Sequence, residues 1–389
     1  MAGRTTARKR TGGIAITFAT MLAVVTPTGS TTAQAETGAA PPFPAEITLI
    51  VGFAPGQGID QPIRPEPGSL ANLRLSPDAS YVQSARFLSQ NLGRFLPGSP
   101  KIQVRNMPGA GGLVAARHLV EAAPADGSVL ALAGANPFFA SLNPASDLQR
   151  AFRDIAYVGT RTRETFLCFA WHTSILLRLE DARVHAAFAG TLGAGSRGQA
   201  HLMALNEFAG TQFRIVAGYS NTFDVSRSLE NGEIEAACGY TMNLLQARHG
   251  DWLRDGRITL LTRFGLAPFA WRTRVPAASA FASEADAGSR EDGGEVRDEL
   301  GRQVMSILDT EGDLVWALAA PPSISPDRLA QLRRAFDAMF VDADANAAAT
   351  REGLVTEPLS GADLQAEVAR VYALPAEALS RVQMLLDAK

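Results

Sequence analysis

The sequence predicts an α/β protein with two units, each a mostly parallel sheet flanked by helices. Short β-branched runs alternate with helical patterns early in the chain, and the same alternation returns in the middle. The length of 389 residues suits about two domains. A hydrophobic fraction of 46% and a charged fraction of 19% exclude a disordered chain. A formal net charge of −3 gives no reason to expect nucleic acid as a partner.

The first unit begins with a predicted buried strand at residues 47–51, Ile-Thr-Leu-Ile-Val. A turn rich in Gly and Pro follows at residues 55–58. Residues 59–80 hold four prolines and little apolar periodicity, so we expect an irregular insertion. Apolar residues then recur at helical spacing as far as Phe95, and Ser80 is the expected N-cap of that helix.

Two more strands complete a βαβαβ pattern. Residues 102–104 and 129–133 predict strands, and residues 113–122 predict the helix between them. Strands connected through helices run parallel, and such crossovers are right-handed. We therefore expect a parallel sheet in this unit.

The middle of the chain repeats the alternation on a smaller scale. A glycine-rich loop at residues 190–196 interrupts it. The other expected elements are strands at 184–188, 213–216, 234–238 and 258–262, and helices at 200–208 and 223–229.

The last third is predicted to be irregular and then helical. Residues 272–303 are rich in Ala, Ser, Gly and charge without a clear period, which indicates a surface excursion. Ser325 before Pro326 predicts the start of a helix. Ser360 and Asp363 have the spacing of a capping box, which predicts another.

The N-terminus has the features of an export signal. Four basic residues precede an uncharged, mostly apolar run of 12 residues at 14–25, and Ala33-Gln34-Ala35 forms an A-x-A site. A membrane anchor is the alternative, but a span needs about 20 residues. We expect residues 1–35 to be a cleaved signal peptide, leaving a periplasmic protein with 32 basic and 39 acidic residues, a net charge of −7.

Two cysteines, Cys168 and Cys238, fall in this exported chain. An oxidising compartment permits a disulfide between them. It would close a 70-residue loop and could stabilise the fold by about 4 kcal/mol. The alternative is two buried thiols in separate strands, and the sequence leaves both open.

Two glycine-rich turns each lie between a predicted strand and a helix, at residues 53–58 and 190–196. Glycine lets the backbone approach a ligand closely, and free N–H groups at a helix start attract anions. If the turns face each other, they could clamp a small acid. Taken alone, each turn is more often an ordinary strand–helix connection, since short glycine patterns also occur by chance.

Candidate catalytic groups are sparse. The sequence has neither H-E-x-x-H nor G-x-S-x-G. His201, just after the second glycine-rich turn, could contact a ligand or serve the structure. Arg161, Arg163 and Arg197 are candidate salt-bridge donors for an acid, with a surface position as the alternative.

In combination, several segments resemble the extracytoplasmic receptors of tripartite tricarboxylate transporters. The resemblance runs with gaps from residue 47 to 386. The segments are Leu-Ile-Val-Gly-Phe-Ala-Pro-Gly at 49–56, Asn-Met-Pro-Gly-Ala-Gly-Gly at 106–112, Ala-Pro-Ala-Asp-Gly at 123–127, Gly-Ala-Gly-Ser at 193–196, Gly-Glu-Ile-Glu at 232–235, and Ala-Pro-Pro with Ser-Pro at 320–326.

The resemblance implies a two-lobed, type II periplasmic-binding-protein-like clamshell. Its expected boundaries are 44–165 with 263–389 for the first lobe and 166–262 for the second. It also implies no catalysis, no cofactor and no metal. The residues expected to hold the ligand are Phe53, Ala54, Gly56, Gln57, Gly58, Asp60, Asn136, Thr160, Thr191, Gly193, Gly195, Ser196, His201 and Tyr219.

The first glycine-rich turn departs from the family pattern. It continues Gly-Gln-Gly-Ile-Asp at residues 56–60, and the next helix is expected about 20 residues later, near Tyr81. The family's Asp position is therefore taken by Asp60 or by Val82.

Three functions follow as hypotheses. The resemblance favours a periplasmic protein that captures a small carboxylate and delivers it to the membrane permease subunits of a tripartite transporter. The alternative is a periplasmic sensor or adaptor with the same clamshell. An exported hydrolase would need a nucleophile–base pair, which the sequence does not reveal.

Overall fold

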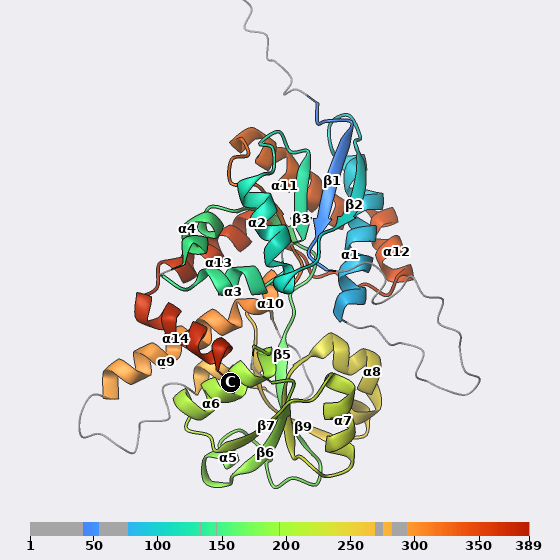
Figure 1. Ribbon diagram of the computed structural model, residues 1–389. Helices are drawn as coiled ribbons and strands as arrows, with labels where there is room; N and C mark the ends of the chain where they lie inside the picture. The colour runs from blue at the N-terminus through green and yellow to red at the C-terminus, as the bar shows by residue number, and fades with distance from the viewer. Residues whose placement is uncertain are drawn as a thin grey trace, which may run out of the picture. The chain divides into compact units, whose positions relative to one another are not determined.

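Two β-sheets organise the protein (Figure 1). The computed structural model describes residues 42–53, 77–132, 134–144, 146–193, 195–268, 275–281 and 294–388. The predicted signal peptide at 1–35, the turn at 55–58 and most of the insertion at 59–80 lie outside these residues. Within the described part, no helix is long and apolar enough to cross a membrane.

The first sheet has the strand order β11-β4-β10-β3-β1-β2. Strand β1 pairs in parallel with both β2 and β3, which confirms the parallel arrangement predicted for the first unit. Strand β10 arrives from late in the chain and pairs antiparallel with β3 and β4. The strands are β1 (Glu46–Val51), β2 (Lys101–Asn106), β3 (Val129–Leu132), β4 (Ala156–Thr160), β10 (Ala317–Ala320) and β11 (Leu359–Ser360).

The second sheet has the order β7-β6-β8-β5-β9 and comes from one continuous stretch of chain. Strand β6 pairs in parallel with β7 and β8, whereas β5 is antiparallel to both β8 and β9. The strands are β5 (Phe166–Trp171), β6 (Ala187–Thr191), β7 (Phe213–Ala217), β8 (Ala236–Thr241) and β9 (Ile258–Phe264).

Both sheets are therefore mixed, and the prediction of mostly parallel sheets was wrong. The antiparallel pairs come from β10 and β11 in the first sheet, and from β5 and β9, at the two ends of the second sheet's stretch of chain. Local patterns show that a segment is extended, but they do not show its direction beside a distant neighbour.

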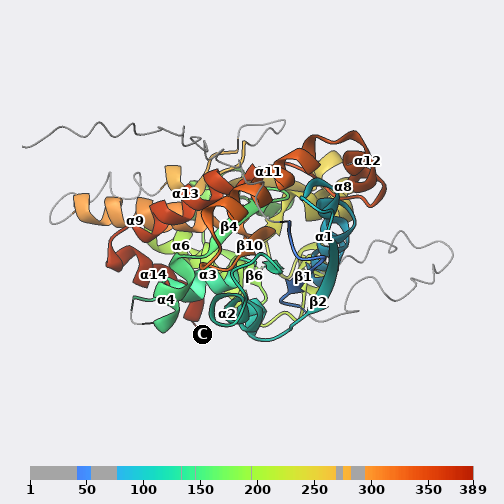
Figure 2. The same ribbon diagram turned by 90° about the horizontal axis from the view of Figure 1, so that it is seen from above.

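Helices connect and cover these strands. In Figures 1 and 2, α2 and α3 lie on one side of the first sheet, and α11 and α13 on the other. The helices are α1 (Pro77–Asn91), α2 (Leu113–Glu121), α3 (Asn136–Ser141), α4 (Asp147–Arg153), α5 (Asp181–Val184), α6 (Arg197–Phe208), α7 (Thr222–Glu230), α8 (Met242–Arg254), α9 (Gly294–Asp309), α10 (Glu311–Leu314), α11 (Pro326–Val341), α12 (Ala343–Arg351), α13 (Gly361–Tyr372) and α14 (Ala376–Asp387), with short 3₁₀ turns at Leu92–Phe95, Ala110–Gly112 and Ala278–Ala280.

Two predicted helix starts are confirmed. The Ser325 hydroxyl accepts a hydrogen bond from the Arg328 backbone N–H at 3.3 Å and caps α11. The Ser360 hydroxyl accepts one from the Asp363 N–H at 3.2 Å and caps α13. A side-chain oxygen at the N-cap satisfies an N–H group that the helix itself leaves without a partner.

Other predicted boundaries were wrong. Helix α1 begins at Pro77, so Ser80 lies inside it and is not its N-cap. The strand expected at 184–188 begins only at Ala187, because Asp181–Val184 forms α5. Strand β6 then continues through Gly190 to Thr191. A Cβ at Gly190 would collide with Ile234, so this glycine permits close packing within a strand and marks no turn.

Residues 272–303 are also more ordered than predicted. Helix α9 begins at Gly294, inside this window, and runs to Asp309. Among its described apolar residues that pack on the core, Leu300 falls inside the window, whereas Val304 and Leu308 lie beyond it. Too little of the apolar period therefore falls within 272–303 for the helix to be recognised there.

The two cysteines form a disulfide. Cys168 on β5 lies opposite Cys238 on β8, and their Cα atoms are 4.1 Å apart. Such close Cα atoms are typical of directly opposed residues in an antiparallel pair. The structure thus decides between the two alternatives that the sequence left open.

Candidate functional site

A short segment contacts residues next to both predicted ligand loops. We call residues 311–316, which comprise α10, Val315 and Trp316, the connector. At its start, Glu311 contacts Arg197 and His201 of α6. At its end, the Trp316 ring lies 4.6 Å from the ring of Tyr81 on α1. Trp316 follows Glu311 by five residues, so residues beside both loops contact the same short segment.

The second glycine-rich loop is shorter than expected, because β6 extends to Thr191. Gly193 and Gly195 have φ angles of +114° and +75°, a region that L side chains rarely adopt. Ser196 then caps α6, accepting from the Gln199 N–H at 3.4 Å, and its hydroxyl lies 2.8 Å from the Thr191 hydroxyl. The loop is therefore closed by side chains at both of its ends.

Arg197 is the first residue of α6 and reaches from this loop to the connector. Its Nε donates a hydrogen bond to Glu311 Oε1, and its guanidinium carbon lies 4.2 Å from the centroid of the Phe166 ring. The Arg197 side chain is 32% exposed, whereas that of Glu311 is 7% exposed. A cation thus stands at the opening of a buried polar cluster.

His201 lies deeper in the same cluster. Its ring is fully buried and stacks on Phe264 at 3.9 Å, and Nε2 lies 3.6 Å from Glu311 Oε2, which is too far for a hydrogen bond. Within the described part of the chain, neither ring nitrogen has a hydrogen-bond partner. Burial lowers the pKa of His201 below its usual value although Glu311 acts against it, so we expect a neutral ring at pH 7.

Glu311 stays ionised despite its burial. Burial alone raises the pKa of its carboxyl group, but the charge of Arg197 and the nearness of His201 outweigh it and leave the pKa below the usual value. This carboxylate therefore depends on Arg197 for its charge balance.

At the first loop, the structure describes only Phe53. Its ring stacks on Tyr81 at 4.1 Å, and its carbonyl oxygen accepts a hydrogen bond from Asn106 Nδ2 at 2.8 Å. Arg161 completes an aromatic row, with its guanidinium carbon 4.8 Å from the centroid of Trp316. The other residues predicted in this loop lie outside the described part of the chain: Ala54, Gly56, Gln57, Gly58 and Asp60.

Glu164 ties the connector to the second sheet's helices. Its Oε1 accepts from Trp316 Nε1 at 3.0 Å, and its Oε2 accepts from Asn243 Nδ2 of α8 at 3.1 Å. Arg161 is 4% exposed and donates through Nε to Ser84 Oγ at 3.1 Å. The surface alternative is therefore wrong for Arg161. Burial lowers its pKa to about 10, so it remains a cation at pH 7.

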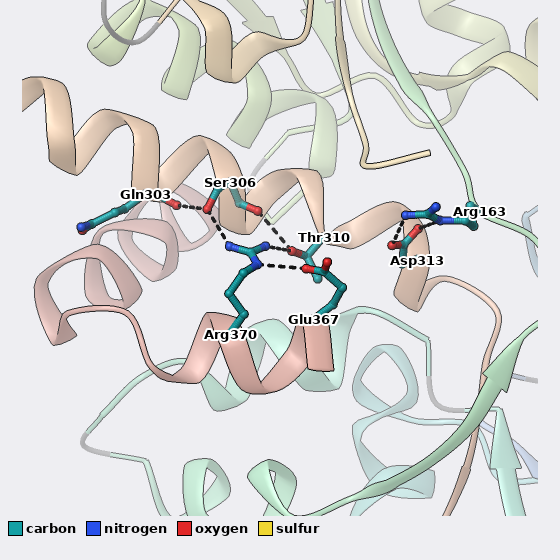
Figure 3. Close-up of polar contacts among 7 residues, drawn as sticks. All are labelled: Arg163, Gln303, Ser306, Thr310, Asp313, Glu367 and Arg370. Carbon is teal, nitrogen blue, oxygen red and sulfur yellow. Dashed lines mark hydrogen bonds and ion pairs between the residues drawn. The ribbon is translucent and has the colours of Figure 1, made fainter. Parts of the chain in front are cut away.

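Arg163 forms a second ion pair with the connector. Its Nε and Nη2 donate to the two carboxylate oxygens of Asp313 at 2.8 and 2.9 Å (Figure 3). Burial raises the pKa of the fully buried Asp313 above its usual value, with Arg163 acting against it. Beside this pair, Arg370 of α13 donates to the hydroxyls of Ser306 and Thr310, which fixes α13 to the end of α9 (Figure 3).

Gly312 lets the connector approach residues 161–165, which link β4 to β5. The Glu164 N–H donates to the Gly312 carbonyl at 3.0 Å. A Cβ at position 312 would collide with the Glu164 carbonyl oxygen. The backbones of the connector and of residues 161–165 can therefore meet only because this residue has no side chain.

Three other predicted site residues make none of the contacts described for this cluster. Thr160 is fully buried in β4 and donates its hydroxyl to the Thr162 carbonyl at 3.2 Å. Asn136 is exposed at the start of α3. Tyr219 is half-buried and packs against the second sheet's core.

Sequence reasoning missed Glu311 and Glu164, whose partners lie far away along the chain. It also missed a serine–histidine pair. Ser226 Oγ lies 3.1 Å from His249 Nε2 and 3.1 Å from the Tyr240 hydroxyl. Burial lowers the pKa of His249 to about 4. Because Ser226 is only 3% exposed, its hydroxyl is not placed to meet a substrate.

Similar structures support the fold. No protein-family model and no curated protein sequence matches the chain. A ligand-free TctC solute-binding protein from Polaromonas matches with a TM-score of 0.60 and 16% identity, over 86% of this chain and 98% of that one. Rpa4515 of R. palustris, determined with adipate, matches with a TM-score of 0.50 and 16% identity, over 87% and 97%.

The fold predicted from the resemblance is therefore confirmed. Two mixed sheets flanked by helices form the two-lobed architecture of periplasmic binding proteins. Chemically, the cluster offers fixed cations and a capped helix start, which suits the binding of an anion.

Proposed function

We propose that this protein is a periplasmic solute-binding protein that captures a small carboxylate and delivers it to the membrane subunits of a tripartite tricarboxylate-type transporter. The observation that carries the proposal is the second loop. There Gly193 and Gly195 precede the capped start of α6, and Arg197 stands at that start as a cation whose side chain is about a third exposed. Backbone N–H groups and a nearby guanidinium are suited to a carboxylate.

The relatives support the ligand class. The R. palustris structure contains adipate, a dicarboxylate. Among the described residues of this chain, no group of three His, Cys, Asp or Glu side chains could hold a metal ion. A binding role also fits the buried position of Ser226 beside His249.

The finer parts of the proposal concern boundaries and location. We propose lobes of residues 44–165 with 263–389 and of residues 166–262, after removal of a signal peptide at 1–35. The ligand would be held between residues 53–60 and the second loop, with Thr191, Ser196 and His201 on the side of the second lobe.

The test is a titration of the mature protein with succinate, adipate, citrate and benzoate. Calorimetry should give a saturable signal for at least one of them. The same ligand should raise the melting temperature as its concentration exceeds Kd, because it binds only the folded state. If none of a broad set of carboxylates binds or stabilises the protein, the proposed function is wrong.

A further inference from the structure

The two ion pairs of the connector use their arginines differently. Arg163 donates through Nε and Nη2 to both oxygens of Asp313. Arg197 donates to Glu311 through Nε alone. Within the described part of the chain, Nη1 and Nη2 of Arg197 donate no hydrogen bond. The outer edge of this guanidinium, which can hold a carboxylate through two parallel hydrogen bonds, is therefore unused.

Arg197 is also the more accessible of the two cations. Its side chain is 32% exposed, whereas that of Arg163 is 19% exposed. The face of the Phe166 ring, 4.2 Å from the guanidinium carbon, holds the cation in place without using any of its N–H donors. The side chain is thus held in position while its donors stay available.

Glu311 has a second partner nearby. The Nε2 atom of His201 lies 3.6 Å from Glu311 Oε2, and this fully buried ring has no hydrogen bond to a described residue. A small shift would allow Nε2–H to donate to Glu311 when Arg197 turns its charge to another anion. The charges facing His201 are those of Glu311 on the connector and Arg197 on its own helix.

We propose that Arg197 is the specificity-determining residue for a ligand carboxylate, and that Glu311 is its internal competitor. In the empty protein, Glu311 takes the Nε donor of Arg197 and offsets its charge. A bound carboxylate takes the Nη1 and Nη2 edge and weakens the bond to Glu311, which His201 then supports. This inference rests on the proposed function, and it explains how a protein of net negative charge selects an anion through a partly exposed arginine at the second loop.

The experiment compares binding of adipate with binding of its neutral diamide, adipamide, by calorimetry in four proteins. Arg197→Gln should weaken adipate binding tenfold or more, since it removes a charge-assisted pair. Glu311→Gln should strengthen it about threefold to tenfold, because the competing charge is lost. Both substitutions should change the binding of adipamide much less than that of adipate, because an amide oxygen accepts a hydrogen bond without the contribution of a charge. Arg94→Gln is the matched control. Arg94 also forms an ion pair, with Asp342 at 2.7 Å, and also contacts an aromatic ring, but it lies away from the second loop, so this variant should bind adipate like the wild type.

The outcomes separate the inference from the proposed function. If the wild type binds neither adipate nor any other carboxylate of the panel, the proposed function falls and the inference with it. If the wild type binds another carboxylate of the panel but not adipate, that carboxylate replaces adipate in the comparison. If the wild type and both variants then bind the ligand equally well, only the inference is wrong. Circular-dichroism melting verifies that each variant is folded. Glu311→Gln keeps the test decisive if Arg197→Gln does not fold, because only competition predicts a gain.

Discussion

The two ion pairs at either end of α10 look alike in sequence terms but differ in kind. Arg163 and Asp313 are joined by two hydrogen bonds, and the carboxylate is fully buried. Arg197 and Glu311 share one donor atom, and the cation is a third exposed. A pair in which both carboxylate oxygens accept from the guanidinium resists change, whereas a pair with unused guanidinium donors can exchange its partner. The comparison teaches that the first pair belongs to the framework and the second to the site.

The largest effect should come from the residue that both pairs share as a neighbour. Gly312→Ala forces a Cβ against the Glu164 carbonyl oxygen, so the connector must move away. Steric conflict with backbone of this kind should cost about 3 kcal/mol or more of unfolding free energy. Urea denaturation measures it. Gly250→Ala is the control, because nothing lies within 4 Å of its Cβ position. Equal midpoints for the two variants would mean that the close approach is unimportant.

Breaking the framework pair should cost more than breaking the site pair. Asp313→Ala leaves Arg163 without its carboxylate in a mostly buried position, which should cost about 3 kcal/mol. Glu311→Gln should cost about 1 kcal/mol, since Arg197 keeps an amide acceptor and partial access to water. Denaturation curves of both variants provide the comparison. The reverse order would contradict the division into framework and site.

His201, which lies beside the site pair, should also give the protein part of its pH dependence. Burial lowers the folded pKa of His201 below 6.5, so its contribution to stability is complete above pH 6.5 and is lost as the pH falls toward the folded pKa. The loss is at most about 1.4 kcal/mol per pH unit. His201→Gln should flatten the decline of unfolding free energy between pH 6.5 and 5. Burial raises the pKa of Asp309 to about 6, so its effect on the unfolding free energy has the opposite sign over this range. That effect is the same in the wild type and in the variant, and it cancels when their slopes are compared. An unchanged slope would show that His201 does not titrate in this range.

The smallest effect should come from an ion pair outside the cluster. Arg94 and Asp342 are 2.7 Å apart, but their side chains are 46% and 31% exposed. Solvent screening leaves such a pair about 0.5 kcal/mol or less. Arg94→Gln should therefore leave the denaturation midpoint nearly unchanged, and raising the salt concentration should remove any remaining difference. A cost near that of Asp313→Ala would show that exposure does not separate these pairs.

The parts of the fold that local chemistry determines could be predicted. Strand β1 is a β-branched run, and Ser325 and Ser360 each cap the helix that follows them. Strand β10, Ala-Leu-Ala-Ala, has no β-branched residue, and only its neighbours β3 and β4 make it a strand. The same holds for the direction of each strand, which depends on distant pairing.

The candidate site was predicted at its loop but not at its centre. The glycines and Ser196 mark the second loop through turn and capping chemistry. Glu311 bonds to a residue 114 positions away, and Asp313 to one 150 positions away. In the sequence, Glu-Gly-Asp at 311–313 resembles an ordinary acidic turn. Nothing local distinguishes a buried acid with a distant arginine from a solvated one.

The strand order also sets the sequence in which the protein can fold. The second sheet uses only residues 166–264 and can close as soon as that stretch is available. The first sheet places β10, at Ala317–Ala320, between β3 and β4, so β4 has no sheet neighbour until residue 320 has emerged. Pairing across such long separations closes large loops and is slow. The unit that begins the chain is therefore the last to be completed, and its open strands β3 and β4 are the surfaces that need protection in the meantime.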